Sequence, residues 1–302
     1  MAFGEKIQRL CFPACQTRVF EGYHRASVRR YGSPKRHVIP DHAASPHRNP
    51  LELCQFLLDQ CRSRNVHVHH PVTVTGVVSS TPNDIVTGLT VRSPDGSERT
   101  MACDALLLTA GVWTPRVFAT LSSKATISLP ISHLSGHSIV LRSPYWIVVE
   151  PPLRPRTGCH AIFTTHSEAN TSLELFSRAG GDIYLAGVNT TTVPVPENAS
   201  EVRPEPTSIE VLIQAARELL GDDQVIVLQT GFCHRPVSST AVPLLTRLTS
   251  EQTGVCLNGG VWMSAGHGPW GISLSLGTGL VLAELLLGKS PSADVSRLGL
   301  SP

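Results

Sequence analysis

The feature that most constrains the fold is an apolar run at residues 105–108, which continues through Thr109 into Ala110 and Gly111. The run does not alternate apolar with polar residues, which is typical of a strand buried on both faces of a helix-covered sheet. Gly111 frees the chain to turn at the carboxyl end of the strand, where α/β proteins bind ligands. We therefore expect an α/β fold with a ligand site after this strand.

A second glycine-rich turn lies at residues 266–271. It follows a predicted strand at 255–257 and precedes a predicted helix at 272–287, which Gly288 ends. The turn has the G-x-G-x-x-G spacing, but no further strand with an acidic residue follows to complete a dinucleotide-binding unit. Its bare main chain and helix start still favour an electron-rich ligand. The spacing fits equally well a plain strand-to-helix turn with Trp270 in the core.

The hydrophobic pattern elsewhere alternates between helical and strand-like stretches. Residues 50–64 and 208–220 carry apolar side chains at helical spacing, and Gly221 ends the second helix. Valine-rich alternation over 66–91 predicts a strand or hairpin region. Residues 1–45 show no sustained period, and we expect an irregular lead-in there. An antiparallel sheet is predicted from short strands at 139–141, 146–149, 161–164 and 183–188, and strand character resumes at 225–228.

Composition narrows the class of protein. The 302 residues carry a net charge of only +2 from scattered Lys and Arg, which argues against nucleic-acid binding. No uninterrupted apolar run reaches the ~18–20 residues of a membrane span, and the N-terminus lacks the pattern of a secretory signal. Eight cysteines without a C-x-x-C pair indicate reduced thiols rather than a zinc site. We expect a soluble cytoplasmic protein, with an organelle as the alternative.

The histidine cluster His67, His69 and His70 is a candidate metal site. Strand spacing would place His67 and His69 on one face and His70 on the other. No nearby carboxylate or cysteine completes a ligand set. We expect a solvated strand face and no bound metal.

Four segments, in order, resemble motifs of one flavoenzyme family. Residues 107–115 resemble the strand–AG–x–W element of the D-amino-acid-oxidase superfamily of FAD-dependent oxidoreductases, and 264–279 resemble its C-terminal flavin loop. Between them, 181–187 resemble the iy-x-gG strand and 231–236 the g-x-RP turn. Because order and separation match as well, the set is more specific than any one motif. The amino-acid sequence of the last turn is most similar to that of the corresponding turn in fungal members of the superfamily.

The resemblance implies FAD as the cofactor and hydride transfer from a C–N bond of a small amine or amino acid. Arg235 falls where amino-acid oxidases bind the substrate carboxylate, a task that suits the planar guanidinium; a surface salt bridge is the alternative. Val74 falls on the strand whose main chain meets the adenine. The remaining cofactor contacts implied are Ala110, Gly111 and Trp113 beside the dinucleotide, and Gly266, His267, Gly268, Pro269, Trp270, Gly271 and Thr278 along the flavin ring and ribityl chain.

The resemblance also divides the chain. Residues 46–112 and 230–302 would form an incomplete, Rossmann-like FAD-binding domain from discontinuous segments, and 113–229 a β-rich antiparallel substrate domain. No strand followed by G-x-G-x-x-G precedes Pro50, so we expect a truncated protein without the pyrophosphate-binding turn. The alternatives are an inactive paralogue acting as a binding or regulatory protein, and a nicotinamide-dependent dehydrogenase.

Two positions depart from the family pattern. Pro269 stands where simple amino-acid oxidases carry a second carboxylate-binding arginine, and Thr240 replaces an acidic residue. A plain D-amino acid is therefore not assured as substrate. Cys233 lies two residues before Arg235, where sarcosine-oxidase-like relatives carry a flavin-linked cysteine, but its flanking residues differ. We expect Cys233 to be a buried free thiol.

Overall fold

The computed structural model describes residues 36–38, 50–80, 85–144, 161–166, 171–178 and 181–300. The chain divides into two compact units. Of the described residues, unit 1 contains 50–133 and 235–300, and unit 2 contains 36–38 and 134–234, with the gaps noted. The assignment of one domain to the cofactor and another to the substrate stays a prediction. The expected lead-in lies outside the described residues, apart from 36–38.

Unit 2 is built on a six-stranded sheet in the order β1-β7-β8-β9-β6-β10, to which unit 1 contributes the ends of β6 and β10. The pairs β7–β8, β8–β9 and β6–β9 are antiparallel, which confirms the predicted antiparallel sheet. The predicted strand at 146–149 lies outside the described residues. The strands are β1 (Arg36–Val38), β6 (Ile131–Arg142), β7 (Ala161–His166), β8 (Thr171–Ser177), β9 (Ile183–Thr190) and β10 (Ile226–Ser238).

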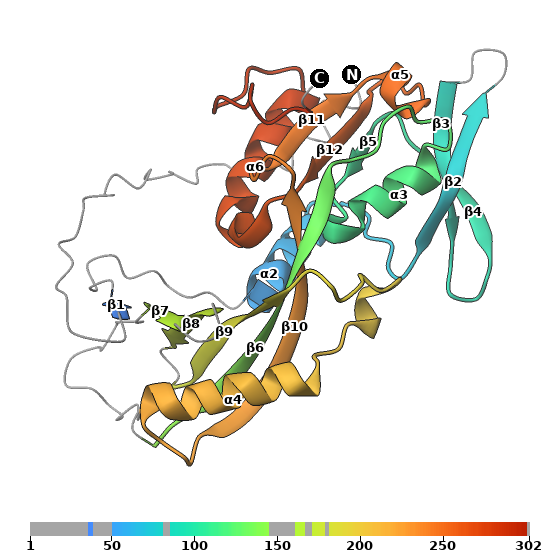
Figure 1. The fold of residues 1–302 in the computed structure, drawn as a ribbon. Helices are drawn as coiled ribbons and strands as arrows, with labels where there is room; N and C mark the ends of the chain where they lie inside the picture. The colour runs from blue at the N-terminus through green and yellow to red at the C-terminus, as the bar shows by residue number, and fades with distance from the viewer. Residues whose placement is uncertain are drawn as a thin grey trace. The chain divides into compact units, whose positions relative to one another are not determined.

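Helix α4 (Pro206–Leu220) covers one face of this sheet, as Figure 1 shows. Its end follows the sequence prediction, because Gly221 adopts the left-handed φ of 64° that ends a helix. Its start lies at Pro206 rather than at the predicted residue 208, because proline suits the first turn of a helix. Ile209, Leu212 and Ala216 form its buried stripe and pack with Leu141, Leu185 and other sheet residues. A short 3-10 helix, η2 (Ala199–Glu201), precedes α4.

Unit 1 contains two three-stranded sheets, ordered β11-β12-β5 and β2-β3-β4. The predicted hairpin is present as β2 and β3, and the helix predicted at 50–64 is α2. The elements are α2 (Pro50–Arg62), β2 (Thr73–Ser80), β3 (Ile85–Arg92), β4 (Glu98–Ala102), β5 (Leu106–Leu108), η1 (Gly111–Trp113), α3 (Thr114–Leu121), β11 (Leu244–Leu248), α5 (Ser250–Thr253), β12 (Val261–Ala265), η3 (Gly268–Trp270) and α6 (Gly271–Leu286).

Strand β5 is shorter than the apolar run that predicted it, but both its faces meet apolar side chains. Leu106 and Leu108 belong to the main cluster of unit 1, whereas Leu107 packs against a separate cluster with Val281 and Leu282 of α6. The prediction of a strand buried on both faces is confirmed in this sense. The run therefore lacks alternation because each side of the strand has its own core.

Two strand predictions were wrong. Residues 255–257 form only an isolated bridge from Cys256 to Ile85, and the strand before the second glycine turn is β12. Val255 and Leu257 are apolar because they are buried in the core, not because they belong to a ladder. Residues 66–72 are irregular, so no strand face presents the histidines. Instead, the rings of His67 and His69 lie 6.4 Å apart and Arg99 Nη2 lies 2.9 Å from His69 Nδ1.

One helical stretch in the described residues, Gly268–Leu286, is long and apolar enough to cross a membrane. It spans 19 residues at a mean hydropathy of 1.3, and only 11% of its most apolar window is buried. The count of uninterrupted apolar residues missed it because Ser, Gly and Thr interrupt the run. A single helix of this kind does not by itself indicate a membrane protein.

Candidate functional site

The two glycine turns predicted to contact a cofactor lie at the same edge of one sheet. Strand β12 pairs in parallel with β5, with Val261 opposite Leu106 and Met263 opposite Leu108. Because the strands run in the same direction, their carboxyl ends meet at one edge. Figure 1 shows β5 and β12 side by side. Ala110 and Gly111 follow β5 in the chain, and Gly266 follows β12.

In the turns after β5 and β12, glycine leaves the main chain uncovered by a side chain. Gly111 and Gly268 each have a φ of 56°, in the left-handed region that favours glycine. A Cβ added at either residue would meet no atom within 4 Å. Gly266 differs, because its φ is 81° and a Cβ there would lie 3.0 Å from Ser238 Cβ. Gly111 and Gly268 therefore leave room for a flat ligand, and Gly266 lets the turn pack against the protein.

Two helices start at this edge without a side-chain cap. Trp113 precedes α3 and Trp270 precedes α6, and neither makes a side-chain capping hydrogen bond. The first-turn N–H groups of a helix carry partial positive charge, which stabilises an electron-rich ligand. Trp270 is 62% exposed, so the alternative in which it fills the core is wrong. Pro269 is also exposed, beside Gly268 in η3.

His267 is held inside the second turn. Its Nε2 lies 3.3 Å from Thr278 Oγ1 on α6, within hydrogen-bonding distance. Two residues predicted to contact the cofactor, His267 and Thr278, therefore contact each other. Burial lowers the pKa of His267 below its ordinary value of 6.5, because partial desolvation disfavours the charged ring. The imidazole is therefore uncharged at neutral pH, and the positive character of the turn comes from the main chain.

A His267→Gln variant is expected to lose less stability in mild acid than the unaltered chain does. As pH falls below about 6.5, the unfolded chain takes up a proton on His267 while the folded chain resists it until a lower pH. The free energy of unfolding therefore falls through that window. Urea unfolding at pH 7.5 and 5.5 should give a smaller difference for the variant than for the unaltered chain. An equal difference in the two proteins would contradict the depressed pKa.

Arg235 lies on the strand that borders the second turn. Val237, two residues further along β10, forms an antiparallel bridge with His267, and Ser132 Oγ donates a hydrogen bond to the Val237 carbonyl. Cys233 is exposed, so the expectation of a buried thiol was wrong. Alternation along an outer strand leaves that position open.

Val74 is not in the same sheet as the two turns. It lies on β2, where it pairs with Val91 of β3, and its side chain packs against the main cluster of unit 1. The structure therefore brings together the residues that follow β5 and β12 but places Val74 elsewhere in the unit. The adenine contact of Val74 stays a prediction.

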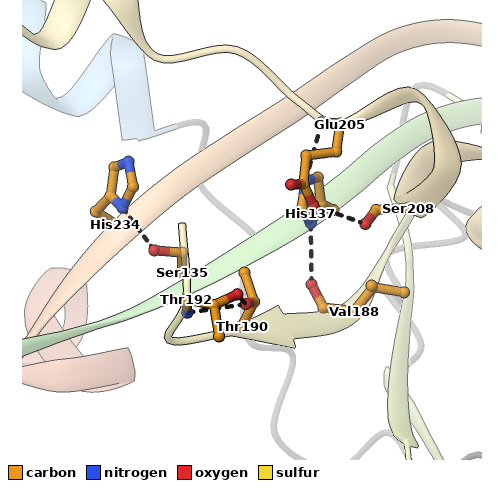
Figure 2. Close-up of polar contacts among 8 residues, drawn as sticks. All are labelled: Ser135, His137, Val188, Thr190, Thr192, Glu205, Ser208 and His234. Carbon is orange, nitrogen blue, oxygen red and sulfur yellow. Dashed lines mark hydrogen bonds and ion pairs between the residues drawn. The ribbon is translucent and has the colours of Figure 1, made fainter. Parts of the chain in front are cut away.

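The sequence analysis missed a polar cluster in unit 2, which Figure 2 shows. Ser135 Oγ lies 2.5 Å from His234 Nδ1, and the fully buried His137 ring binds main-chain groups at both nitrogens. The spacing is a signal that could have found it, because Ser135 and His137 are two residues apart, as are Phe232 and His234. The predicted strands, 139–141 and 225–228, were too short to include either pair. The motif at 231–236 had drawn attention only to Cys233 and Arg235.

Comparison with known proteins settles the family. Residues 42–285 match the model of the FAD dependent oxidoreductase family named DAO. The chain belongs to this family. The match spans the segments around β5, β10 and β12 on which the sequence resemblance rested, so that resemblance and FAD as the family's cofactor are confirmed.

Relatives and solved structures agree with the family. An oxidoreductase of Schizosaccharomyces pombe is 26% identical over 205 residues, covering 66% of this chain and 46% of the relative. A D-amino acid dehydrogenase of Dechloromonas aromatica is 22% identical over 239 residues, covering 79% and 49%. Glycine oxidase from Geobacillus kaustophilus shares the fold, with a TM-score of 0.57, 20% identity, and coverage of 83% of this chain and 57% of that one. The chain thus spans about half the length of the curated relatives it matches.

These solved structures also confirm the fold class. Like them, the chain combines parallel strands, antiparallel sheets and covering helices in a mixed α/β, Rossmann-like arrangement. The residues at the edge of β5 and β12 fit FAD, since the open glycines leave space for a ring and the uncapped helix starts suit its electron-rich edge.

Proposed function

We propose that this chain supplies the flavin-contacting part of an oxidoreductase that oxidises the C–N bond of a small amine or amino acid. The observation that carries the proposal is the parallel pairing of β5 with β12, since it brings two open glycine turns and two helix starts to one edge. Gly111, Gly268 and Gly271 would contact FAD through their main chain. His267 and Thr278 would hold the second turn in shape.

The protein's own groups bind and orient, while FAD when bound supplies the hydride-accepting ring. The N–H groups at the start of α6 would stabilise negative charge on an electron-rich ligand, without a positive side chain. His267 would leave this field unchanged at neutral pH, because its lowered pKa keeps the ring uncharged.

Arg235 is proposed as the group that binds a substrate carboxylate. Its guanidinium can form two parallel hydrogen bonds with a carboxylate, which fixes orientation as well as affinity. The names of the relatives support an amino-acid substrate, since they include a D-amino acid dehydrogenase and a glycine oxidase.

Adding FAD to the purified chain tests the proposal directly. We expect a yellow complex that absorbs near about 450 nm, as bound flavins do, and a rise in melting temperature that grows with FAD concentration. NAD serves as the control and should leave the melting temperature unchanged. A chain that stays colourless and shows no shift in excess FAD would contradict the proposal and favour a binding or regulatory role.

We also propose a cytoplasmic location. The support is that the cysteines in the described residues are free thiols, namely Cys54, Cys61, Cys103, Cys233 and Cys256, as expected in a reducing compartment. Fluorescent tagging of the chain in its host cells, at either terminus, tests this directly.

A further inference from the structure

A polar seam in unit 2 lies where β6 and β10 are neighbours in the sheet, and it ends one residue before Arg235. Ser135 and His137 share a face of β6, and Phe232 and His234 share a face of β10, because residues two apart point the same way. These four residues are called the seam below. Nothing in the proposed reaction uses them.

Ser135 fixes the ring of His234 from one side. The Ser135 hydroxyl is fully buried, and its oxygen lies 2.5 Å from His234 Nδ1 (Figure 2). A buried hydroxyl without a partner is unfavourable, so this bond is strongly preferred. It ties a side chain of β6 to a side chain of β10 and sets the orientation of the imidazole.

Phe232 fixes the same ring from another side. Its ring centroid lies 4.9 Å from that of His234 at an interplanar angle of 74°, and 4.2 Å from that of His137 at 30°. The His137 ring is itself held at both nitrogens, because its Nδ1 lies 3.3 Å from the Val188 carbonyl and its Nε2 accepts the N–H of Glu205 at 3.1 Å. Both bonds form in one tautomer, with the proton on Nδ1.

The main chain of β10 is also held closely against β6. A Cβ added at Gly231 would lie only 2.7 Å from Ser138 Oγ, so the two strands approach more closely than a side chain at residue 231 would allow. Ser138 lies on the face of β6 opposite Ser135. Contacts on both faces therefore fix the position of β10 just before Arg235.

We propose that His234, held by Ser135, is a positioning residue for Arg235. Consecutive strand residues point to opposite faces, so fixing the His234 side chain on one face fixes the direction in which Arg235 leaves the strand on the other. An arginine that is already oriented loses less freedom when it binds a carboxylate. This inference rests on the proposed function, in which Arg235 binds the substrate carboxylate.

Benzoate binding to the full 302-residue chain in the presence of FAD tests the inference. Ser135→Ala removes the hydrogen bond, and His234→Phe keeps a ring but removes Nδ1. Both should raise the benzoate Kd about tenfold and shift the Arg235 Nε–H signal in NMR spectra. His234→Asn keeps a hydrogen-bonding group near the position of Nδ1. Its benzoate Kd and its Arg235 Nε–H signal should therefore stay close to those of the unaltered chain.

The matched control is Thr164→Val in the same sheet. Thr164 is buried, and its hydroxyl donates to the Leu173 carbonyl at 3.3 Å, so this variant also loses one buried hydrogen bond. It should lose stability as Ser135→Ala does, with the benzoate Kd and the Arg235 signal unchanged. If Thr164→Val raises the benzoate Kd as much as Ser135→Ala does, the effect of Ser135 is only a loss of stability. That result would overturn the inference.

Two further results separate this inference from the proposed function. If Arg235→Met weakens benzoate binding but Ser135→Ala does not, Arg235 keeps its role and the positioning by His234 is overturned. If Arg235→Met has no effect, or the unaltered chain binds no benzoate, the carboxylate role of Arg235 and the positioning both fail. FAD binding, measured separately by absorbance, then still decides whether the chain is a flavoprotein.

Discussion

A Gly268→Asp variant is expected to lose FAD affinity about tenfold or more, because the new carboxylate would enter the space left for the ligand. Gly268 has a φ of 56° and no atom within 4 Å of an added Cβ, so a side chain there points into open space beside the start of α6. Negative charge would oppose the electron-rich edge of the flavin and cancel the field of the helix start, and 1.4 kcal/mol suffices for a tenfold change. Absorbance titration with FAD measures the effect.

Gly96→Asp provides the matched control for this variant. Gly96 also has a positive φ, 83°, and open space at its Cβ, but it lies in the turn between β3 and β4. Aspartate at a left-handed position costs about 1 kcal/mol in either variant. Both should therefore lose similar stability, while only Gly268→Asp loses FAD affinity. Equal FAD affinities in the two variants would show that the turn does not contact the cofactor.

A Leu212→Ala variant is expected to lower the free energy of unfolding by about 2–5 kcal/mol, because it deletes fully buried apolar atoms and leaves a cavity. Leu212 is 0% exposed and packs between α4 and the six-stranded sheet. Urea unfolding followed by circular dichroism measures the change. If unit 2 unfolds separately from unit 1, the loss should appear in only one of two transitions.

The neighbouring residue Val211 is the control, because it lies on the outer face of the same helix. It is 53% exposed, so Val211→Ala removes little buried surface and should change stability by less than about 0.5 kcal/mol. Alanine also favours the helix slightly more than valine. A comparable loss in both variants would contradict the packing of α4 against the sheet.

Local chemistry made several elements predictable. Helix α4 ends before Gly221, as predicted, because the glycine acts within its own turn of helix. Gly288 likewise follows the end of α6, with a φ of 69°. Such signals do not depend on tertiary contacts, because they follow from the backbone conformations that proline and glycine allow.

The hydrophobic pattern did not distinguish buried residues that pair in a strand from buried residues that do not. Val255 and Leu257 look like a strand, but they fill the core of unit 1 beside a single bridge at Cys256. Alternation reports which side chains are buried, and hydrogen-bond pairing depends on whether another strand lies alongside. The same ambiguity placed a strand at 66–72, where the chain is irregular.

The sequence by itself determined the family and the two glycine turns, because the order of the motifs can be read along the chain and the conformational freedom of glycine is local. Only the tertiary structure decided that those turns share one edge, since parallel pairing joins residues more than 150 positions apart. It alone also revealed the bond between Ser135 and His234, which lie 99 residues apart. No local signal encodes which two strands become neighbours, because that choice follows from burying the whole apolar surface at once.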